Sequence, residues 1–163
     1  MLRRIPFAIE RVALLTTFLV FAAAPAAAQS YGSGLGGIGL GFIVGEPSGI
    51  NAKLWSGPAT AIDAGLAWSL ADGGATNLYG DFLWHNFDLF DLQSGYLPLY
   101  FGVGGRLQFE EDTRFGIRGV VGLSYIFPSS PLDAFLELVP VFDIAPEGDL
   151  TFNAAIGARY FFR

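Results

Sequence analysis

The chain has 163 residues, with 15 acidic against 9 basic side chains and a formal net charge of −6. This balance excludes the basic patch that nucleic acid binding requires, so we expect no nucleic acid partner. The sequence contains no cysteine, which excludes both a disulfide framework and a thiolate metal site.

Residues 1–28 have the layout of a secretory signal peptide. A basic start precedes an apolar run from Val12 to Ala24, and Ala26 and Ala28 form a small-residue cleavage site. The apolar run is shorter than the about 20 residues that a membrane helix needs. We therefore expect the chain to be exported, with residues 29–163 forming a single domain.

Hydrophobic residues make up 52% of the chain, but after the signal peptide they recur at every second position. Such alternation is typical of β-strands with one apolar face, and turn residues such as Pro, Gly and Asp separate the alternating segments. The pattern predicts eight strands, near residues 35 to 45, 49 to 56, 59 to 71, 76 to 86, 97 to 109, 113 to 127, 132 to 144 and 150 to 162. Eight strands joined mostly by short turns predict an all-β fold, an eight-stranded antiparallel up-and-down β-barrel.

The two faces of these strands differ in charge. One face is apolar and carries no charge, and the other face collects the charged residues. In a soluble carrier barrel the apolar face would line the interior and the charged face would point to water. We therefore predict a transmembrane barrel whose apolar face contacts lipid and whose narrow lumen contains paired charges. The predicted lumen charge network consists of Lys53, Asp63, Asp81, His85, Arg106, Arg114, Arg118, Asp133, Glu137, Asp143 and Arg159.

Hairpin register suggests which charges meet, because residues directly opposite or diagonal on neighbouring strands lie close together. Counting residues outward from the connections of the last three strands shows which positions lie opposite or diagonal to one another. It predicts contacts of Arg114 with Asp143, of Arg118 with Glu137, and of Arg159 with Asp133 and Glu137.

Gly34 to Gly39 spell the dinucleotide-binding pattern G-x-G-x-x-G. They lack the preceding strand and following helix that this pattern requires, so we interpret these glycines as making space on the inner face. Acidic residues gather in the turns opposite the termini, and we interpret them as solvated loop tips. We predict neither a cofactor nor a metal site.

His85 is the sole histidine and shares the inner face with Asp81. A histidine beside a carboxylate can act as a general base, and some outer-membrane barrels of this size are lipid A hydrolases or acyltransferases. Those enzymes act at the lipid-facing surface, and this register places no serine nearby. We favour a hydrogen-bonded structural histidine.

Aromatic residues near the predicted strand ends are typical of interfacial girdles, and we assign Trp68, Trp84, Tyr125, Phe127, Tyr160 and Phe162 to them. The longest connection, residues 86–96, is expected on the periplasmic side together with both termini. It can plug the mouth of the lumen or dock a partner, and the sequence leaves both alternatives open.

Six stretches resemble a family of small, uncharacterised bacterial outer-membrane proteins with an eight-stranded, OmpA-type barrel. They are residues 45–49, 61–63, 83–87, 97–106, 131–137 and 153–157. Gly157, Tyr160 and Phe162 also resemble the assembly signal in the last strand of such barrels. The resemblance implies the fold, an outer-membrane location, and recognition by periplasmic chaperones and the barrel assembly machinery. It implies no activity.

We therefore expect a monomeric integral protein of the outer membrane that contacts lipids and lipopolysaccharide. Its expected role is structural or surface-interactive, without catalysis. The alternatives are a narrow pore, a lipid A-modifying enzyme that uses His85, and a periplasmic lipocalin-like carrier.

Overall fold

The computed structural model describes residues 37–69, 74–110, 112–146 and 148–162, so the predicted signal peptide lies outside the described residues. Eight strands are present there, and their ends differ from the predicted ones by up to three residues. They are β1 (Ile38–Glu46), β2 (Ser48–Trp55), β3 (Thr60–Trp68), β4 (Thr76–Asn86), β5 (Leu99–Phe109), β6 (Arg114–Ile126), β7 (Leu132–Ala145) and β8 (Asp149–Phe162).

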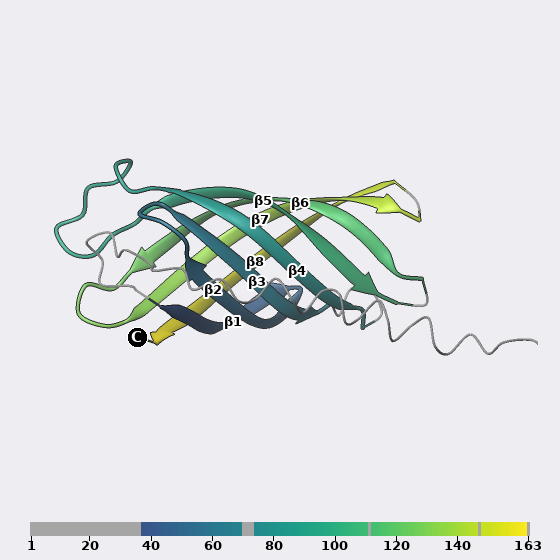
Figure 1. Ribbon diagram of the computed structural model, residues 1–163, viewed down its shortest axis with the longest axis horizontal. Coiled ribbons are helices and arrows are strands. Elements are labelled where there is room, and N and C mark those ends of the chain that lie inside the picture. Colours follow the sequence, from purple (N-terminus) through teal and green to yellow (C-terminus); the bar gives the residue numbers. More distant parts are fainter. Residues whose placement is uncertain (1–36, 70–73, 111, 147, 163) are drawn as a thin grey trace, which may run out of the picture.

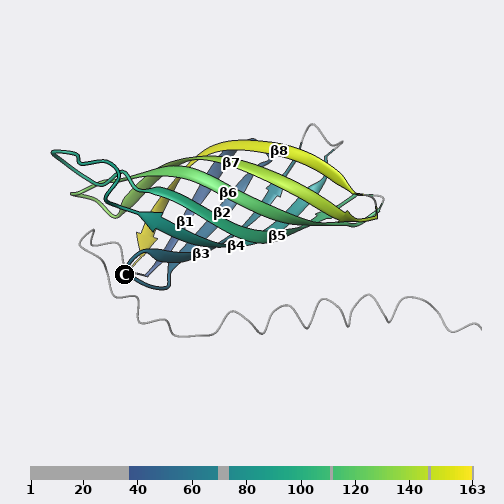
Figure 2. The same ribbon diagram turned by 90° about the horizontal axis from the view of Figure 1, so that it is seen from above.

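The strands form one closed barrel in chain order, and every neighbouring pair is antiparallel (Figures 1 and 2). The barrel closes where β1 pairs with β8, with Gly41 opposite Arg159. Closure gives each strand two hydrogen-bonded neighbours and leaves no open sheet edge. The predicted fold class, an eight-stranded antiparallel up-and-down barrel, is confirmed. Within the described ranges, no helix is long and apolar enough to cross a membrane.

Side chains alternate between the two sides of the barrel wall along most of each strand. Outward-facing apolar residues are widely exposed, as shown by Leu138 at 60% and Phe152 at 73%, whereas the inward-facing Lys53 and Arg159 are each 1% exposed. This distribution is the reverse of that in a soluble barrel with an apolar interior. The outer wall is therefore apolar and the interior contains charged side chains.

The expected girdle residues all lie on the outer wall or just past a strand end. Trp84, Tyr125, Phe127, Tyr160 and Phe162 lie toward the end of the barrel that carries the C-terminus, and Trp68 lies at the opposite end. Several of them pack edge to face, including Tyr125 with Phe127, at 4.8 Å between ring centroids, and Tyr160 with Phe162, at 5.0 Å. One end of the barrel therefore has an aromatic rim, formed by Trp84, Tyr125, Phe127, Tyr160 and Phe162.

Two adjacent glycines in β5 occupy very different surroundings. A Cβ atom added to the inward-facing Gly104 would collide with the side chain of Asp81 and with the backbone carbonyl of Gly80. A Cβ added to the outward-facing Gly105 would come no closer than 3.6 Å to another heavy atom. Only the inner position therefore requires glycine for space.

We expect Gly104→Ala to lower the free energy of unfolding by about 1–3 kcal/mol, because the added methyl group overpacks the interior. Gly105→Ala is the matched control and should be neutral or slightly stabilising, since alanine restricts the unfolded chain more than glycine does. Urea unfolding in detergent micelles, followed by tryptophan fluorescence, measures both changes. Equal stabilities of the two variants would contradict this assignment of the inner face.

Candidate functional site

The interior of the barrel is the candidate functional site, because the polar side chains converge there. Ten of the eleven charged or histidine side chains predicted to face inward are no more than 6% exposed. These are Lys53, Asp63, Asp81, His85, Arg106, Arg118, Asp133, Glu137, Asp143 and Arg159. The remaining one, Arg114, lies at the barrel rim with its side chain 38% exposed.

Arg159 on β8 is the centre of the largest group of contacts, which we call the Arg159 cluster: Arg159, Asp133, Asp63, Asn51 and Lys53. Its Nε donates to Asp133 Oδ1 at 2.9 Å, and its Nη1 donates to Asp63 Oδ2 at 3.2 Å and to Asn51 Oδ1 at 3.0 Å. The guanidinium group also lies 3.9 Å above the ring of Phe135. One buried cation is therefore bound to two carboxylates from different strands, as a buried charge requires.

Lys53 extends the Arg159 cluster toward the end that carries the C-terminus. Its Nζ lies 3.9 Å from Asp133 Oδ2 and donates to His85 Nε2 at 2.8 Å. Because an ammonium group can only donate, Nε2 accepts and the imidazole proton is assigned to Nδ1. The imidazole ring also stacks on Tyr100, with 5.1 Å between ring centroids, and contacts Trp55 at 4.5 Å. His85 is thus held by a cation and aromatic rings.

Two further ion pairs lie closer to the opposite end of the barrel. Arg118 Nε donates to Asp81 Oδ1 at 3.0 Å, and its guanidinium group lies 3.9 Å above the ring of Tyr79. Arg106 binds Asp143 through two hydrogen bonds, from Nη2 at 2.7 Å and from Nε at 3.2 Å. The two-point contact fixes both side chains in the interior.

These partners lie two strands apart, and a glycine occupies the same register position on the strand between them. Gly104 on β5 separates Asp81 from Arg118, and Gly116 on β6 separates Arg106 from Asp143. The same arrangement joins Tyr100 to Glu137 across Gly122, Asn51 to Tyr79 across Gly65, and Arg159 to Asn51 across Gly41. A side chain at these glycines would block the contact.

This arrangement corrects two of the pairs predicted from hairpin register. Arg118 binds Asp81 and not Glu137, while Arg114 binds Glu110 at 3.4 Å and not Asp143. For Arg118 the physical reason is that its long side chain reaches past the adjacent strand to Asp81. For Arg114 the reason is the register of β6 against β7, which places Asp143 opposite Gly116 instead of Arg114.

The contact predicted between Arg159 and Asp133 is formed. The second contact predicted for Arg159, with Glu137, is replaced by the ion pair with Asp63.

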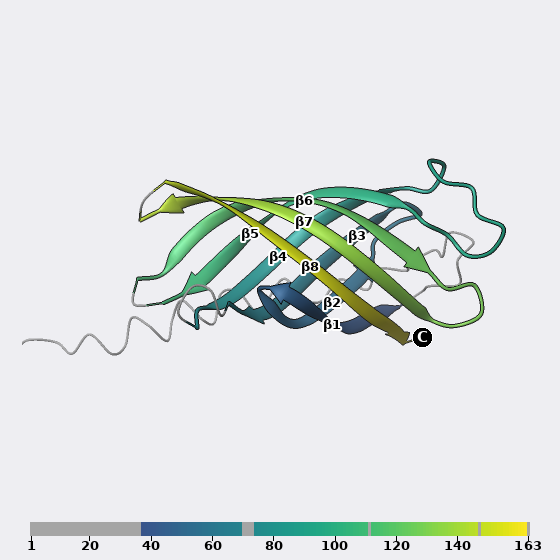
Figure 3. The same cartoon turned by 180° about the vertical axis from the view of Figure 1, so that it is seen from behind.

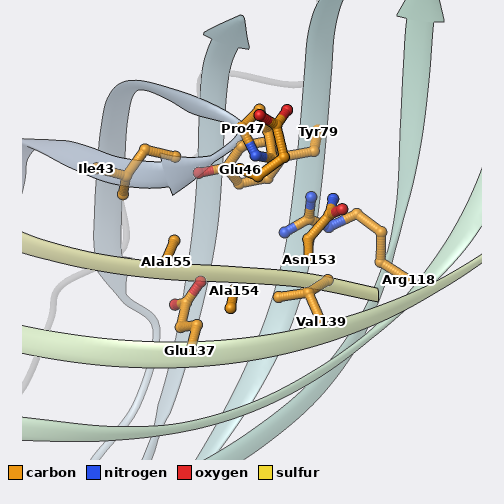
Figure 4. Close-up of a pocket in the computed structure, with 10 residues that line it drawn as sticks. All are labelled: Ile43, Glu46, Pro47, Tyr79, Arg118, Glu137, Val139, Asn153, Ala154 and Ala155. Atoms are coloured by element: carbon orange, nitrogen blue, oxygen red, sulfur yellow. The ribbon is translucent and has the colours of Figure 1, made fainter. Parts of the chain in front are cut away.

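A small cavity remains beside Arg118 and Tyr79, next to Glu46 and Pro47 at the end of β1 (Figure 4). Arg118, Glu137, Tyr79 and Asn153 line it, and Glu137 also accepts a hydrogen bond of 2.7 Å from Tyr100. The volume open to the centre of a water molecule is about 10 Å³, which is roughly one water. This part of the interior therefore has little free space.

Three uncharged residues that sequence reasoning missed complete the contacts: Asn51, Tyr79 and Tyr100. Asn51 donates to Asp63 at 2.5 Å and to Tyr79 at 3.1 Å. All three share the inward parity of the charged residues on their own strands, β2, β4 and β5. This shared parity could have identified the three residues as inward-facing from the sequence.

The geometry of His85 does not match that of a general base. Its Nε2 contacts Lys53, whereas a catalytic histidine is usually oriented by a carboxylate. The predicted inward orientation of both His85 and Asp81 is correct, but Asp81 binds Arg118 instead. Within the described residues, no group of histidine and acidic side chains is placed to hold a metal ion.

A closed eight-stranded barrel with an apolar outer wall and buried charges inside has the architecture of OmpA-type outer-membrane barrel domains. Among solved structures, the chain is similar to the N-terminal β-barrel domain of OprF from Pseudomonas aeruginosa. The TM-score is 0.62 at 13% identity, and the match covers 77% of this chain and 96% of that one. This likeness confirms the OmpA-type fold. No family model and no curated protein matches the sequence.

We expect Asp133→Ala to lower the free energy of unfolding by about 3–5 kcal/mol, because it leaves Arg159 and Lys53 short of a buried counter-charge. Arg114→Ala is the control, since it removes a partly exposed ion pair that contributes less than about 1 kcal/mol. Urea unfolding in the same detergent measures both losses. Similar losses for the two variants would show that the Arg159 cluster contributes no more than a surface ion pair.

Proposed function

We propose that this protein is a monomeric structural component of the outer membrane and that its lumen is closed by interlocking ion pairs. The observation that carries the proposal is the combination of an apolar outer wall with mutually bound charges inside. Lys53, Asp133 and Arg159 are each no more than 1% exposed, whereas Leu138 on the wall is 60% exposed. Only a surrounding apolar solvent makes this distribution favourable, and lipid is that solvent.

Several related expectations belong to the same proposal. Residues 1–28 direct export, and the last strand, through Gly157, Tyr160 and Phe162, is recognised by periplasmic chaperones and the barrel assembly machinery. The wall contacts lipids and lipopolysaccharide. The exposed outward positions of Tyr160 and Phe162, at 48% and 54%, support their recognition from outside the barrel.

The proposal excludes catalysis and transport as the main role. An enzyme would need reactive groups open to a substrate, but His85 is 6% exposed and bound to Lys53. A carrier would need an apolar interior cavity. The interior contacts described above favour a filled lumen, which is what eight strands geometrically allow.

The first test is cellular fractionation followed by a detergent gel with and without boiling. We expect the protein in the outer membrane and a different mobility for the unboiled sample. A closed barrel satisfies its backbone hydrogen bonds internally and resists detergent until heated. Recovery in the soluble periplasm with one mobility would overturn the proposal and favour a carrier.

The second test is electrical. We expect purified protein to give no discrete conductance steps in planar lipid bilayers, because paired side chains occupy the lumen. A known porin, reconstituted in the same way, is the positive control. Reproducible single-channel steps of one size would contradict closure and support the narrow pore.

A further inference from the structure

The loop that joins β4 to β5, residues 87–98, carries an apolar surface that the barrel does not use. Leu89, Phe90 and Leu92 are 52%, 42% and 40% exposed. The loop lies at the same end of the barrel as the C-terminus and extends past the strand ends (Figures 1 and 3). Exposed apolar side chains gathered within a few residues of a loop indicate a surface that meets another apolar phase.

The base of the loop is attached firmly to the barrel. Phe87 packs against the rings of Trp55 and His85, with 6.1 and 6.2 Å between centroids, and Tyr96 packs edge to face against Phe87. The backbones of Tyr96 and Ile126 exchange two hydrogen bonds, of 2.8 and 3.2 Å. Phe87 thus lies at the mouth of the lumen, while residues 88–94 project away from it.

The second limb of the loop lies against the outer wall. The hydroxyl of Tyr125, a residue of the aromatic rim, donates to the carbonyl of Ser94 at 3.4 Å. Gly95, with φ of +75°, turns the chain beside the hydroxyl end of Tyr125. The second limb of the loop therefore lies beside the aromatic rim that, in the proposed function, marks the edge of the membrane.

We propose that Leu89, Phe90 and Leu92 form a foot that inserts into the headgroup region of the inner leaflet, an inference that rests on the proposed membrane location. The lipids it fits are zwitterionic. The loop contains two acids, Asp88 and Asp91, and no base, so an anionic headgroup would be repelled. The position of the second limb beside Tyr125 of the rim favours lipid over a protein partner as the occupant.

Because the natural chain has no cysteine, single-cysteine variants allow site-specific nitroxide labelling. The foot is probed by Leu89→Cys, Phe90→Cys and Leu92→Cys. Ser129→Cys, in the exposed turn after β6 at the same end of the barrel, is the control for water. Leu138→Cys, on the wall, is the control for lipid. Labelled proteins are reconstituted in phosphatidylcholine vesicles.

The readout is the ratio of nitroxide collisions with oxygen to collisions with a water-soluble nickel complex. We expect ratios at the three foot positions severalfold above that of Ser129→Cys and below that of Leu138→Cys. Foot ratios equal to that of Ser129→Cys, with a high ratio at Leu138→Cys, overturn the foot and leave the membrane barrel intact. A low ratio at Leu138→Cys as well overturns the proposed membrane function itself.

Two further comparisons test the occupant. Vesicles containing anionic phosphatidylglycerol should lower the foot ratios, and Asp88→Asn together with Asp91→Asn should restore them; unchanged ratios overturn the preference for zwitterionic lipid. If the foot labels are open to nickel in vesicles but protected in isolated outer membranes, a protein covers the loop and the lipid proposal is wrong.

Discussion

The narrowness of an eight-stranded barrel is the constraint on which the rest of this structure depends. The interior cannot hold a long side chain at every inward position, so each long side chain needs an empty place beside it. Glycines supply these places. Asp81 reaches Arg118 across Gly104, and Arg106 reaches Asp143 across Gly116. Glycine placement therefore decides which charges can meet.

This constraint also explains why the crowded interior favours one register of the strands. A buried ion pair gains little free energy over a well-packed apolar pair, but breaking one leaves a charge that neither water nor lipid can solvate. Each cation of the interior binds a carboxylate from another strand, and Arg159 binds two. Slipping one strand by a single residue would turn its charges toward the outer wall. The pairs thus fix strand register even where their net contribution to stability is small.

Much of the fold followed from the sequence because period-two alternation is a local signal. It located eight strands and assigned residues such as Lys53 and Leu138 to the correct faces. The ion pairs were harder to predict, since hairpin register relates only neighbouring strands. Arg159 and Asp133 do lie on neighbours and were paired correctly, whereas Arg118 and Asp81 lie two strands apart. Finding that pair required knowing the register of three strands at once.

The register of β6 against β7 shows the same limit at a smaller scale. The sequence of β6 and β7 alternates smoothly, so hairpin counting placed Arg114 opposite Asp143. The connection after β6 instead sets Ile126 opposite Asp133, and the same register places Asp143 opposite Gly116, where Arg106 reaches it from β5. The β-bulge at Phe115/Gly116 comes only after that pair. Arg114 is left at the rim, where it binds Glu110. The register set by one connection is thus coupled to a long-range contact, because it brings Asp143 to the position at which Arg106 on β5 binds it across β6.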